Sequence, residues 1–378
     1  MSYTYRNHIV IVFSLDHYNP LNLIRSVGEQ GINPIYYCIK GKRNLFIADK
    51  SEYISKCFYF DTVADAFNHL LREYGSEKYK PFLLFGDDKT IEYFDKHYDD
   101  VKDRFYFFNA GKKDRVFEFM DKNAVLEIAK RHGFNVLPSK VVKLGELKHG
   151  IEYPIITKDI NPNSGSWKSD VFICKNEQEL IEAYKTITSP TILIQRFVDK
   201  KNEYCLEGFA INQGTQVMVS TSITYKYLIQ GYYSPYHDVL PFDDKEMYKK
   251  LVNLFSDIGY EGIFEVEFLI DKNDILWFLE INFRASAFNY TGTVAGMNIP
   301  FLWMESTLER NIDSSKKKNF EPFTAICEPI DYGIRVDKNI ISLANWIKDF
   351  KNAKCTYYFN EKDMTPFSYA LENWSEFK

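Results

Sequence analysis

Residues 262–286 read GIFEVEFLIDKNDILWFLEINFRAS, and this stretch decides the fold of the C-terminal half. Two apolar runs flank the short polar segment DKND, which is the pattern of antiparallel strands joined by a tight turn. Leu279 and Ile281 alternate with polar residues in the second run, so one face of that strand suits burial. The stretch therefore predicts a β-hairpin with one apolar face and one polar face.

The polar face of this hairpin carries carboxylates, an amide and a guanidinium. Glu265 and Glu267 share a face of the first strand, and Glu280, Asn282 and Arg284 share a face of the second. Carboxylate and amide oxygens that converge from neighbouring strands suit Mg²⁺, and phosphate oxygens would complete its shell. Arg284 is suited to bind a phosphoryl oxygen. We therefore predict a site for magnesium and phosphate, against the simpler alternative of a polar sheet face turned to water.

The composition limits the other possibilities. The chain has 378 residues, more than one hydrophobic core usually serves, so we expect two or three domains. A net charge of −5 argues against a nucleic-acid surface, and no apolar run approaches the roughly 18 residues of a membrane span. The six cysteines include no CxxC pair, so neither a zinc site nor a disulfide framework is expected. We expect a cytoplasmic protein with no nucleic-acid or membrane partner.

The first 118 residues predict an open α/β domain. Apolar runs such as HIVIVFSL and PFLLFGDD are typical of strands buried on both faces of a parallel sheet, and segments with helical spacing separate them. Asp16, Asp87 and Asp88 follow the first and last of these strands, at the edge where such sheets bind ligands. Capping of the next helices explains these residues equally well. No GxGxxG follows the first strand, so the usual dinucleotide fold is not expected.

The remaining chain predicts three further units. Residues 119–194 have the pattern of a small α+β module, residues 195–310 contain the hairpin, and residues 311–378 form an α+β extension. Lys122 opens a helix and Lys158 ends an apolar strand, so each could hold a phosphate by its charge, although either alone would be ordinary on a surface. The segment NPNSGSWKSD that follows has the small residues of a phosphate-covering loop but only one glycine.

Taken in order, these motifs resemble the ATP-grasp superfamily of carboxylate–amine ligases, in its D-aspartate-ligase-like and carbamoyl-phosphate-synthase-like branch. The resemblance covers most of the chain and rests on DKNAVLEIAKRHGFNVLPSKVV, YPIITKD, ILIQRFVDKKNEY, GIFEVEFLID and FLEINFRAS. It implies an N-terminal pre-ATP-grasp domain with an open parallel sheet, followed by two α+β modules that clasp a nucleotide. The E-I-N-x-R element in its hairpin is specific, whereas the loop with one glycine is not.

The resemblance also implies a role for each motif residue. Lys122 and Lys158 would bind the nucleotide phosphates, Glu203 would accept from the ribose hydroxyls, and Arg284 would steady the transferred phosphoryl group. Lys226 is a weaker catalytic candidate, and an ordinary surface lysine explains it equally well. The implied contacts are Gln195, Arg196, Phe197 and Val198 for adenine, and Glu267, Glu280 and Asn282 for Mg²⁺, with Mn²⁺ as an alternative ion.

Some positions depart from the family pattern. Gln195 and Arg196 stand where members often place a glutamate, and Phe283 replaces the usual small residue or proline, which raises the question of a reshaped catalytic floor. The phosphate loop is poor in glycine. Glu265 competes with Glu267 as the metal ligand, and the family's sequence context favours Glu267.

The expected function follows from these motifs. We expect an ATP- and Mg²⁺-dependent ligase that activates a carboxylate as an acyl phosphate and joins it to an amine, with release of ADP and phosphate. Amino-acid-type substrates and a homodimer are implied by the resemblance alone. Tyr232, Tyr233 and His237 are candidates for the specificity surface, although a structural role explains each of them better. An ATP-binding sensor or scaffold that has lost catalysis stays an alternative. A nucleotide-sugar transferase is disfavoured, because DKND has the wrong spacing for a D-x-D motif.

Overall fold

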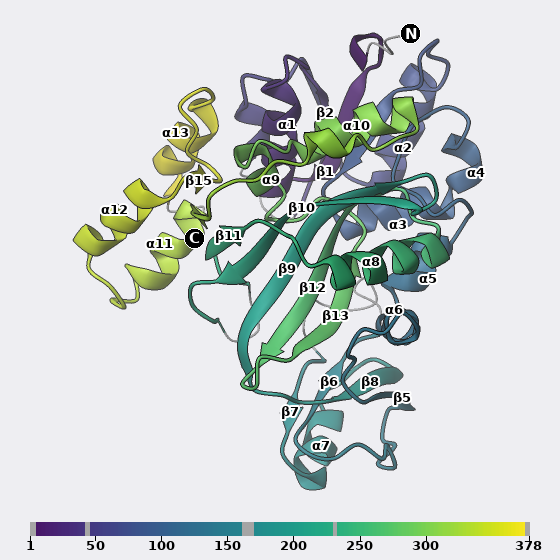
Figure 1. Ribbon diagram of the computed structural model, residues 1–378, viewed down its shortest axis with the longest axis vertical. Coiled ribbons are helices and arrows are strands. Elements are labelled where there is room, and N and C mark those ends of the chain that lie inside the picture. Colours follow the sequence, from purple (N-terminus) through teal and green to yellow (C-terminus); the bar gives the residue numbers. More distant parts are fainter. Residues whose placement is uncertain (1–4, 42–45, 161–169, 230–232, 375–378) are drawn as a thin grey trace.

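The computed structural model describes residues 5–41, 46–160, 170–229 and 233–374. Figure 1 shows an N-terminal α/β layer at the top, a large central sheet below it, a small lid module at the bottom and the C-terminal helices at one side. The sheets confirm the expected multidomain fold, in which a parallel sheet is followed by α+β modules.

The N-terminal domain is an open parallel sheet with the strand order β3-β2-β1-β4. β1 and β4 have the sequences VIVFSL and FLLF and are buried along most of their length, as continuous apolar runs predict. These two strands are neighbours, so their carboxyl ends meet at one sheet edge. The elements are η1 Tyr5–Asn7, β1 Val10–Leu15, α1 Tyr18–Gly28, β2 Ile35–Ile39, η2 Ala48–Lys50, β3 Lys56–Phe60, α2 Val63–Tyr74, β4 Phe82–Phe85, α3 Asp88–Lys96 and α4 Tyr98–Val101.

The lid module has a hydrophobic core of its own, built from residues between Val142 and Ile194. Its antiparallel sheet has the order β5-β8-β6-β7, and α7 packs on β7. α6 instead packs on β13 and joins the larger core of the molecule. The predicted lid bounds, residues 119–194, stay a prediction. Because α6 packs on β13, it lies with the larger core and not with the core of the lid. The elements are α5 Arg115–Met120, α6 Lys122–Arg131, β5 Ser139–Lys143, β6 Ile155–Lys158, β7 Ile173–Cys174, α7 Glu177–Tyr184 and β8 Thr191–Arg196.

A seven-stranded sheet forms the centre of the molecule, with the order β13-β12-β9-β10-β11-β14-β15. β14 and β15 run parallel, and the other neighbours are antiparallel. One face of the sheet packs on α8, where Phe255 stacks on Phe264 with ring centres 4.2 Å apart. The elements are β9 Lys200–Ile211, β10 Gln216–Tyr225, β11 Tyr236–Leu240, α8 Lys245–Ile258, β12 Gly262–Asp271, β13 Leu276–Asn282, α9 Tyr290–Val294, α10 Ile299–Glu309, η3 Ser314–Lys316, β14 Phe323–Ile326 and β15 Cys355–Thr356.

The C-terminal extension adds β14 and β15 to the central sheet and is tied to the N-terminal domain by buried polar contacts. Arg25 of α1 is fully buried, and its guanidinium donates to Asp363 and to the carbonyls of Tyr357 and Tyr358. The first and last parts of the chain therefore form one packed body. The helices of the extension are α11 Glu328–Arg335, α12 Leu343–Asn352 and α13 Thr365–Glu372.

Glu328 makes the stability of this body depend on pH. Glu328 is 2% exposed and accepts the backbone N–H groups of Tyr357, Tyr358 and Phe359. Burial raises the pKa of Glu328 from 4.5 to about 7, although those N–H groups lower it. Between pH 4.5 and about pH 7, Glu328 holds a proton in the folded protein that it has released in the unfolded chain. This contribution to the free energy of unfolding is therefore present below about pH 4.5 and is lost as the pH rises to 7.

We expect Glu328→Gln to remove this dependence on pH. Between pH 5 and pH 8, the free energy of unfolding should fall more in the wild type than in the variant, by on the order of 1–3 kcal/mol. Urea denaturation at several pH values measures both slopes. Burial also raises the pKa values of Asp16 to about 7 and of Asp95 to about 6, so the difference between the two proteins isolates Glu328. Equal slopes would contradict the assignment.

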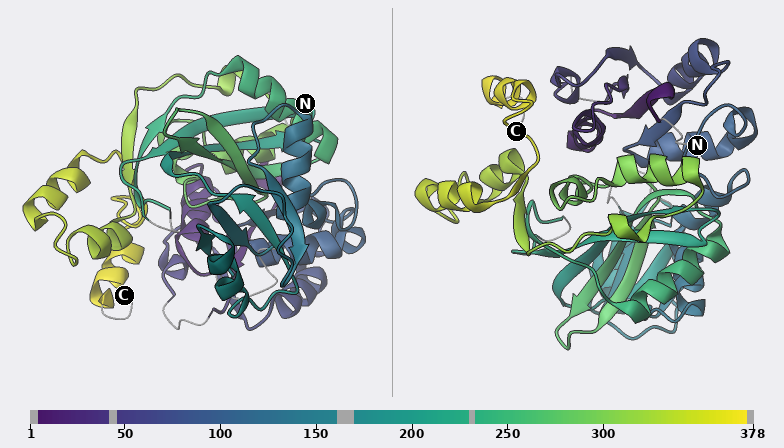
Figure 2. Two further views of the ribbon diagram at one scale, coloured as in Figure 1. Left: turned by 90° about the horizontal axis from the view of Figure 1, so that it is seen from below. Right: turned by 45° about the horizontal axis from the view of Figure 1, so that its top comes forward.

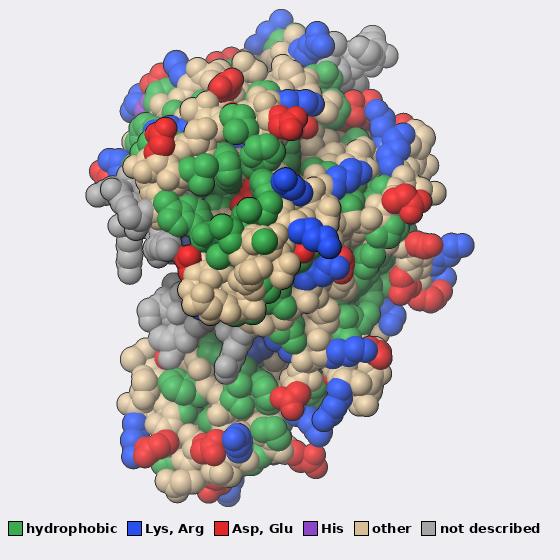
Figure 3. All heavy atoms as spheres, turned by 90° about the vertical axis from the view of Figure 1, so that its left-hand side faces the viewer, with side chains coloured by type: hydrophobic (Ala, Val, Ile, Leu, Met, Phe, Trp, Pro, Cys, Tyr) green, Lys and Arg blue, Asp and Glu red, His purple; other side chains and the backbone are tan. Residues whose placement is uncertain are grey.

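The surface shows the lid as a separate lobe. Figure 2 gives two further views, in which the C-terminal helices project from the side of the main body. Figure 3 faces that side, with the lid as the lower lobe and hydrophobic side chains gathered on the upper one. Ile340, Leu343 and Leu371 of the extension are 63%, 49% and 52% exposed.

No helix within the described ranges is long and apolar enough to cross a membrane.

Candidate active site

The register of the β12–β13 hairpin decides which polar side chains meet. Glu265 lies opposite Asn282, and Glu267 lies opposite Glu280. Directly paired residues point to the same side of a sheet, so all of these side chains share one face, here called the active face. The pairing shifts by one residue just after Glu267, which is a β-bulge of the kind that re-aims side chains near functional sites.

Glu207 extends the polar row to a third strand, β9. It lies opposite Glu265, is fully buried and accepts a hydrogen bond from the Ser286 hydroxyl. Burial raises the pKa of Glu207, although Ser286 and the charge of Arg284 lower it. Sequence reasoning missed Glu207. Its spacing of four residues from Glu203 was the available signal, since residues four apart on one strand share a face.

Asn282 lies at the centre of this row. Its Nδ2 donates to Glu265 at 2.9 Å and to Glu267 at 2.7 Å, and its Oδ1 accepts from the Arg284 guanidinium at 3.0 Å. Burial raises the pKa values of Glu265 and Glu267 well above 4.5, and neighbouring carboxylates raise them further. The row is therefore short of positive charge, which a bound cation would supply.

The donor set fits Mg²⁺. Glu267, Glu280 and Asn282 offer two carboxylates and an amide oxygen, which are hard oxygen ligands. The amide of Asn282 must turn over so that Oδ1 rather than Nδ2 faces the carboxylates, and its two ends have nearly the same shape. The described ranges contain no group of three or more His, Cys, Asp or Glu arranged to hold a metal ion. The site therefore depends on Asn282 and on phosphate oxygens, and the choice between Glu265 and Glu267 stays a prediction.

Arg284 is held in place by a carboxylate from the N-terminal domain. Its Nε donates to Asp88 Oδ1 at 2.9 Å, and Asp88 begins α3 just beyond the carboxyl end of β4. Burial alone would lower the pKa of Arg284, but Asp88 and Glu265 raise it above its ordinary value, so the guanidinium stays charged. A fixed guanidinium next to the proposed metal ligands can bind a phosphoryl oxygen.

The other two aspartates at the strand ends have structural roles. Asp87 is the N-cap of α3 and accepts the N–H of Thr90 at 2.9 Å. Asp16 accepts the N–H groups of Ile47 and Ala48 at 3.0 and 3.2 Å and so fixes that loop. The capping explanation is therefore confirmed for Asp87, and only Asp88 of the three reaches the active face.

Two lysines lie at the edge of the active face, Lys122 at the start of α6 and Lys158 at the end of β6 in the lid. Lys158 donates from Nζ to Gln195 Oε1 at 2.9 Å, and Lys122 Nζ lies 3.7 Å from Glu280 Oε2. Burial lowers the pKa of Lys158 to about 8, while Glu280 raises it and Lys122 lowers it. The structure thus brings Lys122, Lys158, Gln195 and Glu280 together from α6, β6, β8 and β13.

The hinge between the lid and the central sheet follows β8. The N–H groups of Arg196 and Phe197 donate to the carbonyls of Pro138 and Pro154 at 2.8 and 2.9 Å, so both are used within the protein. Across the described ranges, the N–H of Val198 has no backbone partner outside regular elements. Of these three N–H groups, the one at Val198 is therefore the one that the described backbone contacts leave available.

Lys226 lies apart from the two lysines near Glu280. It follows the last residue of β10, and its Nζ pairs with Asp238 of β11 at 2.7 Å. Ile223 of β10 pairs with Cys205, which shares the active face of β9 with Glu207. Tyr225 therefore faces the site, and alternation turns Lys226 to the other side of the sheet. The surface-lysine explanation therefore fits Lys226. Glu203 lies on the active face, where it forms an ion pair with Lys200.

Phe283 belongs to the hydrophobic core. It is 1% exposed and packs edge-on against Tyr260, with ring centres 4.9 Å apart. The Tyr260 hydroxyl donates to the carbonyl of Phe283 at 2.8 Å. Asn282 and Arg284 alternate with Phe283 and face the site, so the expectation that Phe283 reshapes the catalytic floor is wrong.

The specificity candidates lie near the seam between domains. The Tyr233 hydroxyl accepts a hydrogen bond from the hydroxyl of Tyr18 in α1. His237 is fully buried, its Nε2 lies 2.9 Å from the Tyr357 hydroxyl, and burial lowers its pKa to about 3, which agrees with a structural role. Tyr232 and most of the phosphate loop, residues 161–169, lie outside the described residues.

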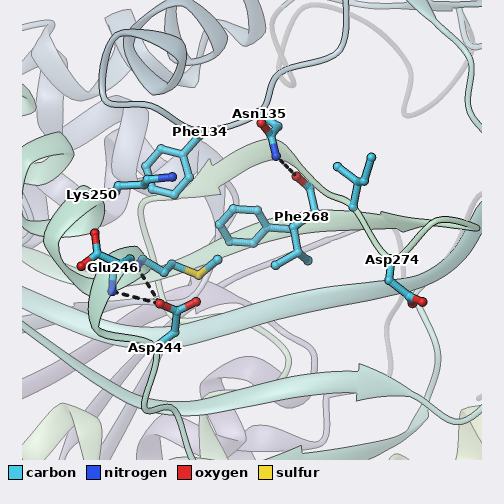
Figure 4. A pocket seen from close by; sticks show the side chains of 10 residues that line it. Phe134, Asn135, Asp244, Glu246, Lys250, Phe268 and Asp274 are labelled. Carbon is cyan, nitrogen blue, oxygen red and sulfur yellow. Dashed lines mark hydrogen bonds between the residues drawn. The ribbon is translucent and has the colours of Figure 1, made fainter.

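A separate pocket of about 360 Å³ lies on the other side of the hairpin. Figure 4 shows Phe134 and Phe268 facing its centre, with Asp244 and Lys250 at one side. Phe268 follows Glu267 directly along β12 and so points away from the active face. This pocket is therefore not part of the candidate active site.

Residues 117–303 match the family model described as the carbamoyl-phosphate synthase L chain, ATP binding domain. The matched span contains both lysines, the hinge and the whole hairpin. This match places an ATP-grasp domain within residues 117–303 of the chain. Members of the ATP-grasp superfamily are ATP-dependent ligases, and dependence on magnesium is typical of them.

Solved structures of this superfamily share the fold of the chain at low sequence identity. N5-carboxyaminoimidazole synthetase from Staphylococcus aureus is 16% identical with a TM-score of 0.66, and the match covers 87% of this chain and 85% of that one. A biotin carboxylase in complex with β,γ-ATP from Campylobacter jejuni is 18% identical with a TM-score of 0.65 and coverages of 85% and 76%. An L-amino acid ligase from Bacillus licheniformis is 15% identical with a TM-score of 0.62 and coverages of 84% and 79%.

Proposed function

We propose that this ATP-grasp protein is an ATP- and Mg²⁺-dependent ligase that joins a carboxylate to an amine, with substrates of the amino-acid type. One observation carries the proposal. Lys122 of α6 lies 3.7 Å from Glu280 of the hairpin, beside an Arg284 that pairs with Asp88 of the N-terminal domain. Cations for phosphate, oxygen ligands for a metal and a fixed guanidinium thus converge on one face.

Different residues bind different parts of ATP. Lys122 and Lys158 bind the phosphates, the hinge at Val198 meets adenine, and Glu203 accepts from the ribose. Glu267, Glu280 and Asn282 hold Mg²⁺, which when bound neutralises phosphate charge. Gln195 orients Lys158 through its hydrogen bond. Each group positions or neutralises, and none forms a covalent bond with the substrates.

The reaction proceeds in two displacements. A carboxylate oxygen attacks the γ-phosphorus of ATP, the bond to the bridging oxygen breaks, and ADP leaves. The amine nitrogen then attacks the acyl carbon, phosphate leaves, and the amine loses a proton as the amide forms. Arg284 balances the charge that develops on the transferred phosphoryl group. The lid covers the site and excludes the water that would hydrolyse the acyl phosphate.

A screen of phosphate release tests the proposal. The protein is incubated with ATP and Mg²⁺ and with amino acids singly and in pairs, followed by peptides and other small carboxylates. Release that requires both a carboxylate and an amine, with ADP as the product, supports the ligase. Failure of every pool, together with tight ATP binding by calorimetry, would favour the ATP-binding sensor instead.

Lys158→Met should weaken ATP binding about 10- to 100-fold, because a charged hydrogen-bond donor to phosphate is lost. The affinity of the wild type should also fall as the pH rises through about 8, where the Lys158 ammonium loses its proton, and the variant should lack this step. Calorimetric titration between pH 7 and pH 9 measures both effects. Lys143→Met, at an exposed lysine of the lid, is the matched control. Affinities that agree in all three proteins would refute the role of Lys158.

A further inference from the structure

Three chain segments that are distant in the sequence are bonded together beside Arg284. Asn19 of α1 donates from Nδ2 to the carbonyl of Gly86, after β4, at 3.2 Å and to that of Ala285, after β13, at 3.5 Å. The N–H of Ala285 donates to the carbonyl of Phe85 at 3.1 Å. The start of α1, the end of β4 and the end of the hairpin therefore form a single junction.

His17 lies in this junction as the N-cap of α1. Its Nδ1 accepts the backbone N–H of Asn19 at 3.1 Å, so Nδ1 carries no proton and the neutral ring carries its hydrogen on Nε2. His17 is half-buried, and its Nε2 has no hydrogen-bond partner in the part of the chain that the structure describes. Nε2–H is therefore a donor of fixed position that remains available.

The junction places His17 near the ion pair of Arg284 and Asp88, because Asn19, two residues after His17, donates to the carbonyl of Ala285, which follows Arg284 directly. Burial and then the positive charge of Arg284 lower the pKa of His17 to about 4, while Asp88 raises it. Arg284 and Asp88 are the two members of the ion pair described above. The imidazole stays neutral at pH 7 and can donate a hydrogen bond without giving up its proton.

We propose that His17 binds the carboxylate substrate, donating from Nε2 to an oxygen of the acyl group that Arg284 faces. This inference rests on the proposed ligase function and adds a substrate-binding residue that comes from the N-terminal domain. Arg284 balances the charge of the phosphoryl group, and His17 orients the acyl group next to it. A neutral N–H donor binds an acyl oxygen only when the oxygen lies along the N–H direction. A second cation would instead attract any nearby anion.

His17→Asn separates this role from capping. Asparagine is among the best N-cap residues, so α1 keeps its cap, whereas the shorter side chain no longer presents the Nε2 donor. Thr62→Asn makes the same kind of exchange at the N-cap of α2, away from the site, and serves as the matched control. With the carboxylate and amine that support ADP formation, KM for the carboxylate should rise about tenfold in His17→Asn. KM for ATP should stay within about twofold, and Thr62→Asn should match the wild type.

A binding measurement gives a readout that does not require turnover. Acetonylphosphonate, a stable analogue of an acyl phosphate, is titrated by calorimetry into the complex with Mg²⁺ and ADP. We expect binding about tenfold weaker in His17→Asn than in the wild type and Thr62→Asn. Equal binding and equal kinetics would overturn the role of His17 and leave the ligase intact. Binding that depends on His17 without turnover in any pool would support the acyl site and refute the ligase. Absence of both binding and turnover in the wild type would overturn both proposals.

Discussion

Replacement of Glu280 by alanine should lower the rate of ADP formation by about 10²–10³-fold while the protein stays folded. Glu280 faces Glu267 across the hairpin and lies 3.7 Å from Lys122, so it connects the proposed metal site to the lysine that binds phosphate. Its removal takes away a metal ligand and the partner of that lysine. The fold should survive, because the Glu280 side chain is 35% exposed and its loss leaves the buried hydrophobic residues unchanged.

Initial rates of ADP formation at saturating ATP, measured across Mg²⁺ concentrations, check this prediction. Asp274→Ala is the matched control, since Asp274 is a carboxylate in the turn of the same hairpin with a side chain 69% exposed. The control should keep the rate of the wild type, and circular dichroism should show equal folding of both variants. Full activity of Glu280→Ala would end the magnesium assignment.

Replacement of Arg25 by methionine should destabilise the protein by about 3–5 kcal/mol. Arg25 and Asp363 are both fully buried and paired at 2.8 Å, and the same guanidinium donates to the carbonyls of Tyr357 and Tyr358 at 2.9 and 2.8 Å. Methionine fills much of the volume but leaves a buried carboxylate without its counter-charge and the carbonyls of Tyr357, Tyr358 and Asp363 without this donor. Removal of one partner from a buried pair is strongly destabilising for this reason.

Urea denaturation followed by tryptophan fluorescence measures the effect, and Trp346 and Trp374 in the extension report on its release. Arg72→Met on α2 is the control, because the Arg72 side chain is 67% exposed and pairs with neighbouring Glu73 at the surface. We expect a change within about 0.5 kcal/mol there. Equal losses in the two variants would show that the buried pair contributes nothing beyond side-chain removal.

Much of the fold, and the face on which the candidate site residues lie, could be predicted because both depend on local patterns. Alternation along residues 262–286 places acids, amide and guanidinium on one face whatever packs around them. Continuous apolar strands predict the parallel sheet, and the turn DKND predicts the hairpin. The same local rule explains Phe283, whose position between Asn282 and Arg284 already turns it toward the core.

Other features of the site are decided by partners that are distant along the chain. Nothing local separates Asp87 from Asp88, yet one caps α3 and the other holds Arg284, 196 residues away. Lys226 and Lys158 both lie at the end of a strand, so the sequence gives no local difference between them. Only the packed sheet shows that Lys226 pairs with Asp238 and faces away from the site.

The sequence by itself therefore determined the order of the elements, the hairpin and the face on which its polar side chains lie, because periodicity and turn chemistry act over a few residues. Only the tertiary structure decided that Lys122 meets Glu280, that Asp88 fixes Arg284, and that Glu207 and His17 lie beside them. Burial and long-range pairing set the charge, position and availability of each of these groups, and both exist only after the strands and domains have packed together.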